Sequence, residues 1–250
     1  MIKQVFFFLA ILGALSAFSQ SSRFVYSLDT SYVPSNRYLE EYTLESYYAS
    51  GAGNVSIEFG ALESELLNAA VFYAFNKART DRNKKKLRYE PQLDFLGHNC
   101  VHYFSKSKFR YSKRNELLYE KILYLAARKM PIKCHLFKAN TGLVSLMDIE
   151  PKRKVHRNLE DHRSPYRLYY RNPPELKDDL EDIVEPLTYN QFAERVVESI
   201  YTRKTRKRLN SNSYETMACY VYIEPRSIRS NKPPYAKVIQ IIGAKRLALD

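Results

Sequence analysis

The sequence predicts an α+β fold in which a mixed or antiparallel sheet packs between helices. Three observations carry this prediction. Apolar residues recur at helical spacing in four segments, two segments near the C-terminus have the β-branched and aromatic composition of strands, and a proline-bearing connector joins those two strands. With 250 residues, 45% of them hydrophobic, the chain fits one domain with one core and a leader.

The helical segments differ in how their ends are marked. Glu63 and Glu65 place negative charge in the first turn of the first helix, where the helix dipole favours it. Pro91 opens the second helix, which we expect to pack on the first, and Pro131 ends the third. The four segments are residues 61–79, 91–104, 115–130 and 189–203.

The remaining segments predict strands and connections. Residues 217–223 and 236–242 are rich in Val, Ile and Tyr and predict an antiparallel pair with a long loop, and residues 143–149 predict one further short strand. Residues 151–186 are charged and proline-bearing, so we expect an irregular insertion there. Residues 21–60 are rich in Ser, Tyr and Asn and predict an extended N-terminal segment.

The first twenty residues, MIKQVFFFLAILGALSAFSQ, have the order of a cleavable secretory signal peptide. One basic residue, Lys3, precedes an apolar run that is followed by small residues at Ala17 and Ser19. The apolar run is shorter than the roughly 20 residues that span a bilayer, and no later segment approaches that length. We therefore expect a secreted or periplasmic protein, with a retained membrane anchor as the alternative.

Charge restricts the choice of partner more than it restricts the fold. The formal net charge of +13 favours anionic polysaccharide, an acidic lipid surface or nucleic acid as partner through long-range attraction. Positive charge is concentrated in residues 79–88 and 203–208. The alternative is a basic surface that only keeps the protein soluble.

Cysteine and histidine give little sign of a metal site. Cys100, Cys134 and Cys219 are too few for a disulfide scaffold, and at most one pair can form. We expect them to be mainly small buried hydrophobic residues. His98 and His102 lie four residues apart on one helical face, but no second pair of ligands stands nearby. The sequence therefore predicts neither a metal site nor a cofactor.

Residues 66–109 and 188–243 resemble the CAP/SCP superfamily of cysteine-rich secretory, antigen 5 and pathogenesis-related proteins, which implies a domain of that type over residues 61–244. LLNAAVFYAFNKAR is similar to the first helix of that family, LRYEPQLDFLGHNC to its entry into the second helix, and YNQFAERVVESIYTRKTRKRLN to its last helix and following loop. The strands YVYI and VIQIIG are similar to its closing pair. The resemblance implies an α-β-α sandwich and a divergent, bacterial-type member.

The same resemblance implies that the metal site of the family is degenerate here. One family His position falls on Lys113, after Tyr111 and Ser112, or on Lys106 in an alternative alignment, and the second falls on or near Lys204. An ammonium group offers only hydrogen-bond donors and repels a divalent cation, whereas a neutral imidazole donates a lone pair to it. The family's Gly-Glu-Asn signature is also not recognisable.

The expected function is therefore a secreted, non-catalytic binding module with no assigned catalytic residue. Its basic cleft, formed by Tyr111, Ser112, Lys113 and Lys204, would bind an anionic ligand, a polysaccharide or a lipid surface. Two alternatives remain: an extracellular polyanion binder that uses the two basic runs, and a peptidase-like hydrolase that uses histidines placed differently from the family pattern. The five candidate histidines are His98, His102, His135, His156 and His162.

Overall fold

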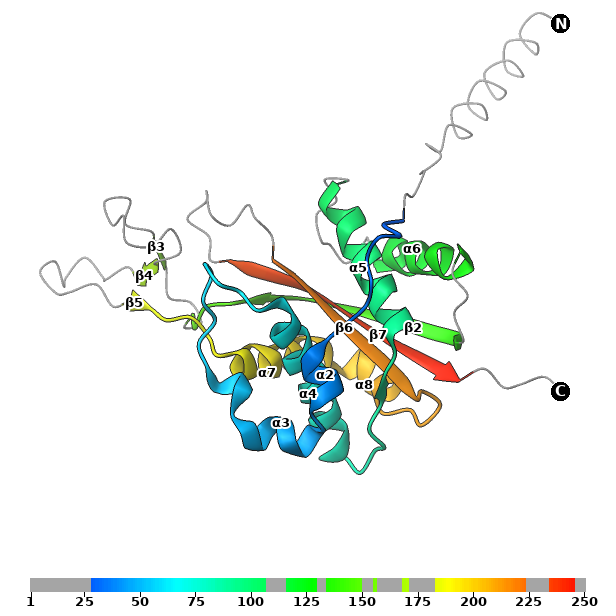
Figure 1. Ribbon diagram of the computed structural model, residues 1–250, viewed down its shortest axis with the longest axis horizontal. Helices are drawn as coiled ribbons and strands as arrows, with labels where there is room; N and C mark the ends of the chain where they lie inside the picture. Colours follow the sequence, from blue (N-terminus) through cyan, green and yellow to red (C-terminus); the bar gives the residue numbers. More distant parts are fainter. Residues whose placement is uncertain are drawn as a thin grey trace, which may run out of the picture.

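A computed structural model describes residues 28–106, 116–129, 134–149, 155–156, 168–170, 183–223 and 234–245. It confirms the α+β fold, because a four-stranded mixed sheet runs between two layers of helices (Figure 1). The predicted signal peptide lies outside the described residues. Within them, no helix has the length and apolar character needed to cross a membrane.

The four-stranded sheet has the order β1-β6-β7-β2. β6 (Thr216–Ile223) and β7 (Tyr235–Lys245) form the predicted antiparallel pair. β2 (Cys134–Ser145) pairs antiparallel with β7 along its whole length, so the strand expected at residues 143–149 begins earlier and ends sooner than predicted. The two-residue β1 (Arg88–Tyr89) joins β6 in parallel and makes the sheet mixed.

The helices divide between the two faces of this sheet. α4 (Ser64–Thr80) and α7 (Tyr189–Ile200) cover one face, whereas α5 (Pro91–Lys106) and α6 (Glu116–Lys129) cover the other (Figure 1). The expectation that α5 packs on α4 is therefore wrong. The apolar stripes of the two helices are real, but a strand buried on both faces stands between them.

Alternation along β6 explains the two layers. Met217, Cys219 and Val221 join the core beneath α4 and α7, while Ala218 joins the core beneath α5 and α6. Successive side chains of a strand point to opposite faces, so each layer takes every second residue. Cys219 is consequently separated by the sheet from Cys100 of α5, and both are buried and free, in agreement with the expectation of small buried hydrophobic residues.

Residues 28–60 are not simply extended, contrary to the prediction for residues 21–60. They contain α2 (Arg37–Glu41), α3 (Leu44–Ser50) and the 3-10 turn η1 (Ala52–Asn54). These helices are short and pack through tyrosines, so they have no stripe of aliphatic residues. The Tyr73 hydroxyl of α4, for example, donates to backbone carbonyls at 2.9 and 2.6 Å in the α2 region.

Two more elements differ from the prediction. Within the expected irregular insertion, β3 (Val155–His156), β4 (Leu168–Tyr170) and β5 (Ile183–Val184) form a small antiparallel sheet. Strands of two or three residues are too short to show alternation in the sequence. The fourth predicted helix ends at Ile200, and α8 (Arg203–Leu209) follows it as a separate helix.

Gly97 lets α5 cross β6 at close range. A Cβ atom added at this residue would lie 2.8 Å from the Cβ atom of Tyr220, closer than real Cβ contacts. The Cβ atom of Tyr220 is fixed to the backbone of β6 and cannot turn away. The missing side chain therefore sets the separation between the helix and the sheet.

We predict that Gly97→Ala lowers the free energy of unfolding by about 1–3 kcal/mol, because the added methyl group forces α5 and β6 apart. Urea titration followed by circular dichroism measures the change. Gly60→Ala is the matched control, since nothing lies within 4 Å of the added atom, and it should be within roughly 1 kcal/mol of wild type. Equal stability of the two variants would contradict the close crossing.

Candidate functional site

The cleft predicted from the sequence is only partly within the described residues. Tyr111, Ser112 and Lys113 lie outside them, and the structure does not place them relative to Lys204. Lys204 is exposed on α8. The convergence of Lys113 and Lys204 on one cleft thus stays a prediction, and the described part of the candidate site begins at α8.

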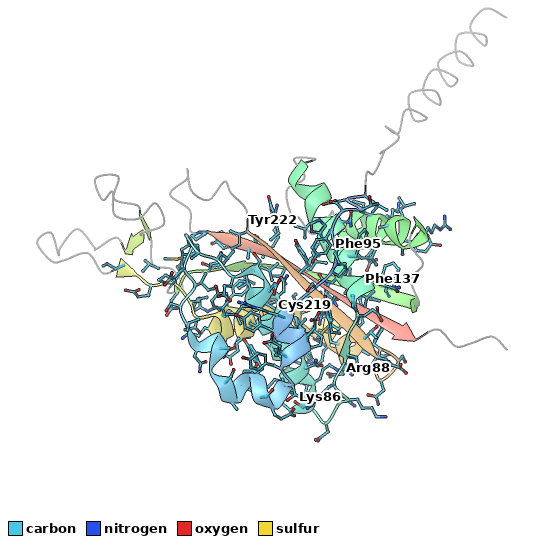
Figure 2. All side chains as sticks on the ribbon, in the orientation of Figure 1. Lys86, Arg88, Phe95, Phe137, Cys219 and Tyr222 are labelled. Carbon is cyan, nitrogen blue, oxygen red and sulfur yellow. The ribbon has the colours of Figure 1, made fainter. Side chains whose placement is uncertain are left out.

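Around α8 the structure joins the two basic runs of the sequence into one surface. The turn after α4 and the helix α8 lie next to each other, although more than a hundred residues separate them. We call their cations the basic surface. Its members are Arg82, Lys84, Lys85, Lys86 and Arg88 on the turn and β1, and Arg203, Lys204, Arg206, Lys207 and Arg208 on α8. Figure 2 shows Lys86 and Arg88 at the lower edge of the molecule in this view.

Arg79 holds the two halves of the basic surface together. Its side chain is buried, and its Nε donates to the Lys85 carbonyl at 2.9 Å. The two terminal nitrogens donate to the carbonyls of Leu209, the last residue of α8, and of Ser211 just after it. Burial lowers the pKa of the guanidinium. A planar fork that bonds three backbone carbonyls fixes the turn against α8, so Arg79 is structural and positions cations without presenting its own charge.

Backbone hydrogen bonds within the turn fix its conformation. The Asn83 amide donates to the Thr80 carbonyl at 2.9 Å, and the Lys84 amide donates to the Arg79 carbonyl at 2.9 Å. Asn83 has a positive φ of 54°, a conformation that asparagine adopts more readily than most residues. This pair of bonds is the Schellman motif, which ends a helix with one left-handed residue. The lysines after Asn83 therefore leave α4 in a defined direction.

Tyr201 forms the contact between the turn and the start of α8. The Arg82 guanidinium lies over its ring at 4.4 Å from the centroid, a cation–π contact. Burial raises the pKa of the Tyr201 phenol, while the positive charges of Arg82, Arg79 and Arg206 oppose the rise. Three guanidinium groups from two elements are thus close enough to act on one ring.

The helix dipole favours only a part of the positive charge of α8. Arg206, Lys207 and Arg208 stand in the last turn, where the dipole favours cations. Arg203 and Lys204 stand in its first turn, where the helix dipole disfavours cations by roughly 0.3–1 kcal/mol each, and no acidic residue stands there. Arg203 and Lys207 also form a like-charged pair four residues apart, which costs roughly 0.2–0.5 kcal/mol. Burial of Leu209 and its bond to Arg79 compensate for this cost.

Acidic neighbours cancel only a part of the basic surface. Lys86 pairs with Glu45, Arg88 lies 3.8 Å from Glu215, and Arg208 lies 4.0 Å from Glu120. In the described part of the chain, the other seven members of the basic surface have no salt bridge. They lie along two sides of a contact that Arg79 and Tyr201 fix, so they present positive charge to solvent.

A second polar group lies where α5 crosses β6. His98 of α5 contacts Tyr220 of β6 through Nδ1 at 2.9 Å and Asp29 through Nε2 at 3.0 Å. Asp29 belongs to the segment before α2, and its backbone amide donates to Asn99 Oδ1 at 2.6 Å. Residues 28–33, which we call the strap, thus lie against α5 beside the close crossing at Gly97.

Tyr32 and Asp94 extend this group toward the core. The Tyr32 ring stacks on the His98 ring with centroids 3.8 Å apart and planes 7° apart, and its hydroxyl donates weakly to Asp94 at 3.5 Å. The Tyr89 hydroxyl of β1 donates to the other Asp94 oxygen. Asp94 itself is buried at 3% exposure, so the two phenols replace water as its donors.

Burial sets the protonation of this group. It raises the pKa of Asp94 to about 6, although the bonds from Tyr89 and Tyr32 and the nearby imidazole oppose the rise. Burial, together with the charges of Asp94 and Asp29, raises the pKa of Tyr220 to about 12. Hydrogen bonds from Ser31 and the contact with His98 lower the pKa of Asp29. The site therefore contains one ionised carboxylate and one that titrates near pH 6.

The described residues form no metal site. No group of three or more His, Cys, Asp or Glu side chains is arranged to hold an ion in them. Of the five candidate histidines, only His98 has a described side chain, and both of its ring nitrogens have a partner. A hydrolase would need two of these histidines to share a pocket with a carboxylate, and the described side chains place only His98 beside one, Asp29.

Sequence reasoning missed most of this second group. The sequence pointed to His98 beside His102 and among the five candidate histidines, but it did not connect His98 with Tyr220 or Asp29. Asp29 and Tyr32 lie in a segment without hydrophobic periodicity, and their partners are about sixty to seventy residues away in the sequence. No local sequence pattern indicates such a contact. The one available signal was Asp94, a carboxylate inside the apolar stripe of α5.

We predict that Asp94→Asn flattens the pH dependence of stability between pH 4 and pH 6.5. The pKa of Asp94 is raised in the folded protein, so the folded state holds this proton more tightly than the unfolded chain, and wild type loses stability as pH rises through this window. The loss should be on the order of 2 kcal/mol. Urea titrations at several pH values measure it, with the exposed Asp81→Asn as control, and an unchanged slope in Asp94→Asn would contradict the assignment.

Comparison with known proteins gives no match: no protein-family model fits the chain, and neither the curated proteins nor the solved structures provide a similar one.

Proposed function

We propose that this protein is a secreted, non-catalytic binding module that attaches to a linear polyanion through the basic surface. One observation carries the proposal: Arg79 joins two basic runs, distant in the sequence, into one surface. A net charge of +13 adds long-range attraction toward any anionic partner.

The layout of the cations favours a long ligand over a small one. The members of the basic surface follow a turn and then a helix, and most of them are exposed. A polymer with repeated sulfate or phosphate groups can contact many such cations at once, and each contact releases counterions. The like-charge repulsion along α8 is understandable if the helix is there to present cations.

Kinship with the CAP/SCP superfamily is part of the same proposal. Its support is the similarity of the quoted segments, which correspond to α4, α5, α7, β6 and β7 of the structure. Export follows from the expected signal peptide. The sequence supports both the kinship and export, and the test of the basic surface depends on neither.

Reversal of charge on α8 tests the proposal. We expect Lys204→Glu and Lys207→Glu each to elute from a heparin column at lower salt than wild type, and the double variant at lower salt still. Each lost contact should reduce the dependence of log affinity on log salt by about 1. Arg128→Glu is the control, because it changes the net charge equally but lies on α6, where Arg128 stacks on Tyr124.

The comparison of the α8 variants with Arg128→Glu distinguishes binding at the basic surface from attraction to the net charge of the protein. If Arg128→Glu shifts elution as much as the α8 variants, binding follows net charge alone and the basic surface is not the site. If the α8 variants elute with wild type, the polyanion proposal is wrong.

A charge-neutral change at Arg79 tests the arrangement. Arg79→Lys keeps the positive charge but cannot form the three-carbonyl fork, so we expect a loss of about 1–3 kcal/mol in the free energy of unfolding. At temperatures where the variant is folded, its heparin affinity should also fall, because the turn and α8 are no longer fixed. Retained affinity in a destabilised but folded variant would show that the fixed arrangement is unimportant.

A further inference from the structure

The strap contacts the body of the protein much as a bound peptide would. In the described structure, residues 28–33 belong to no helix or strand, and Thr30, Ser31 and Val33 are exposed, the last at 78%. Their hydrogen bonds to the body run through the Asp29 amide, the Asp29 carboxylate and the Tyr32 hydroxyl. Two side chains and one amide of a short segment thus make its polar contacts with the rest of the protein.

The receiving surface is complementary to those three groups, and Asp94 accepts from the Tyr32 hydroxyl. Asn99, at 1% exposure, directs Oδ1 to the Asp29 amide, and its own Nδ2 is fixed by the Phe95 carbonyl at 3.0 Å. His98 is oriented by Tyr220 at 2.9 Å and receives the carboxylate. The residues of α5 and β6 are therefore held in place by contacts of their own.

Aromatic packing completes the match. The Tyr32 ring stacks on His98, and it meets Tyr220 edge to face at 6.3 Å and Phe95 at 6.3 Å. Leu28 packs against the core beneath α5. The surface thus selects a carboxylate, a backbone amide and, three residues later, an aromatic ring.

We propose that Phe95, His98, Asn99 and Tyr220 form a binding site for an acidic–aromatic peptide segment of the type Asp-x-x-Tyr, and that the strap is its tethered occupant. The strap closes the site in this structure. Its release exposes the site to the same segment supplied by another polypeptide. This site is separate from the basic surface, so failure of either proposal leaves the other untouched.

A peptide supplied in trans tests the proposal on the full chain. The variant Asp29→Ala with Tyr32→Ala keeps the strap but removes its two recognition groups. We expect a labelled peptide of residues 28–33, Leu-Asp-Thr-Ser-Tyr-Val, to bind this variant at least tenfold more tightly than wild type in a fluorescence anisotropy titration. A scrambled peptide of the same charge controls for attraction to the basic surface, and His98→Ala added to the variant should abolish the gain.

Three results would overturn the proposal: no gain in affinity for the folded double variant, equal affinity for the scrambled peptide, or a gain that persists without His98. Hydrogen exchange of wild type provides a test that does not depend on folding of the variant. The Asp29 amide donates to Asn99 and the Val221 amide donates to Asn68, so both are held by an asparagine side chain. We expect the Asp29 amide to exchange at least tenfold faster, through local release of the strap, and equal rates would show that the strap opens only when the protein unfolds.

Discussion

Burial of β6 on both faces is the constraint on which the rest of the structure depends. Met217 and Cys219 require α4 and α7 on one side, while Ala218 requires α5 and α6 on the other. The outer edge of β6 is also engaged, because β1 pairs with its first two residues and Asn68 of α4 accepts a hydrogen bond from the Val221 amide at 2.9 Å. α4 and α5 pack directly against this strand, and α8 is held in turn by Arg79 of α4.

β1 connects the two polar sites through that strand. The Arg88 amide donates to the Glu215 carbonyl at 2.8 Å, and the Glu90 amide donates to the Met217 carbonyl at 3.2 Å. These bonds fix the end of the basic turn on one side and Tyr89, a donor to Asp94, on the other. A two-residue strand thus sets the position of a surface cation and of a buried phenol together, although the two sites have different chemistry.

The sequence predicted the elements whose periodicity is long and whose ends are marked. Pro91 stands at the start of α5 as expected, and the Val and Ile content of residues 217–223 and 236–242 identified β6 and β7. α2 and α3 were missed because tyrosine supplies their packing. The sequence also did not predict which face of the sheet α5 covers. An apolar stripe indicates that a helix is buried, but it does not indicate which element the helix packs against.

The two candidate sites also differ in how much of each the sequence could predict. The basic runs were visible as composition, but their union depends on Arg79, whose side chain bonds carbonyls that lie six and about 130 residues away. The strap contacts were invisible, since Asp29 and Tyr32 reach His98 and Asp94 across more than sixty residues. Hydrogen bonds between distant segments leave no periodic trace in a single sequence.

The group around His98 has the order carboxylate, imidazole, hydroxyl that nucleophilic enzymes use, and its electrostatics favour recognition instead. Burial and two nearby carboxylates raise the pKa of Tyr220 to about 12, so its hydroxyl stays protonated and can donate a hydrogen bond. The Tyr32 ring lies flat on the imidazole at 3.8 Å, in the space that a substrate would need. Asp29 and Tyr220 contact both imidazole nitrogens and so fix the orientation of the ring. In this structure the group around His98 therefore holds the strap, through the Asp29 carboxylate and the Tyr32 ring.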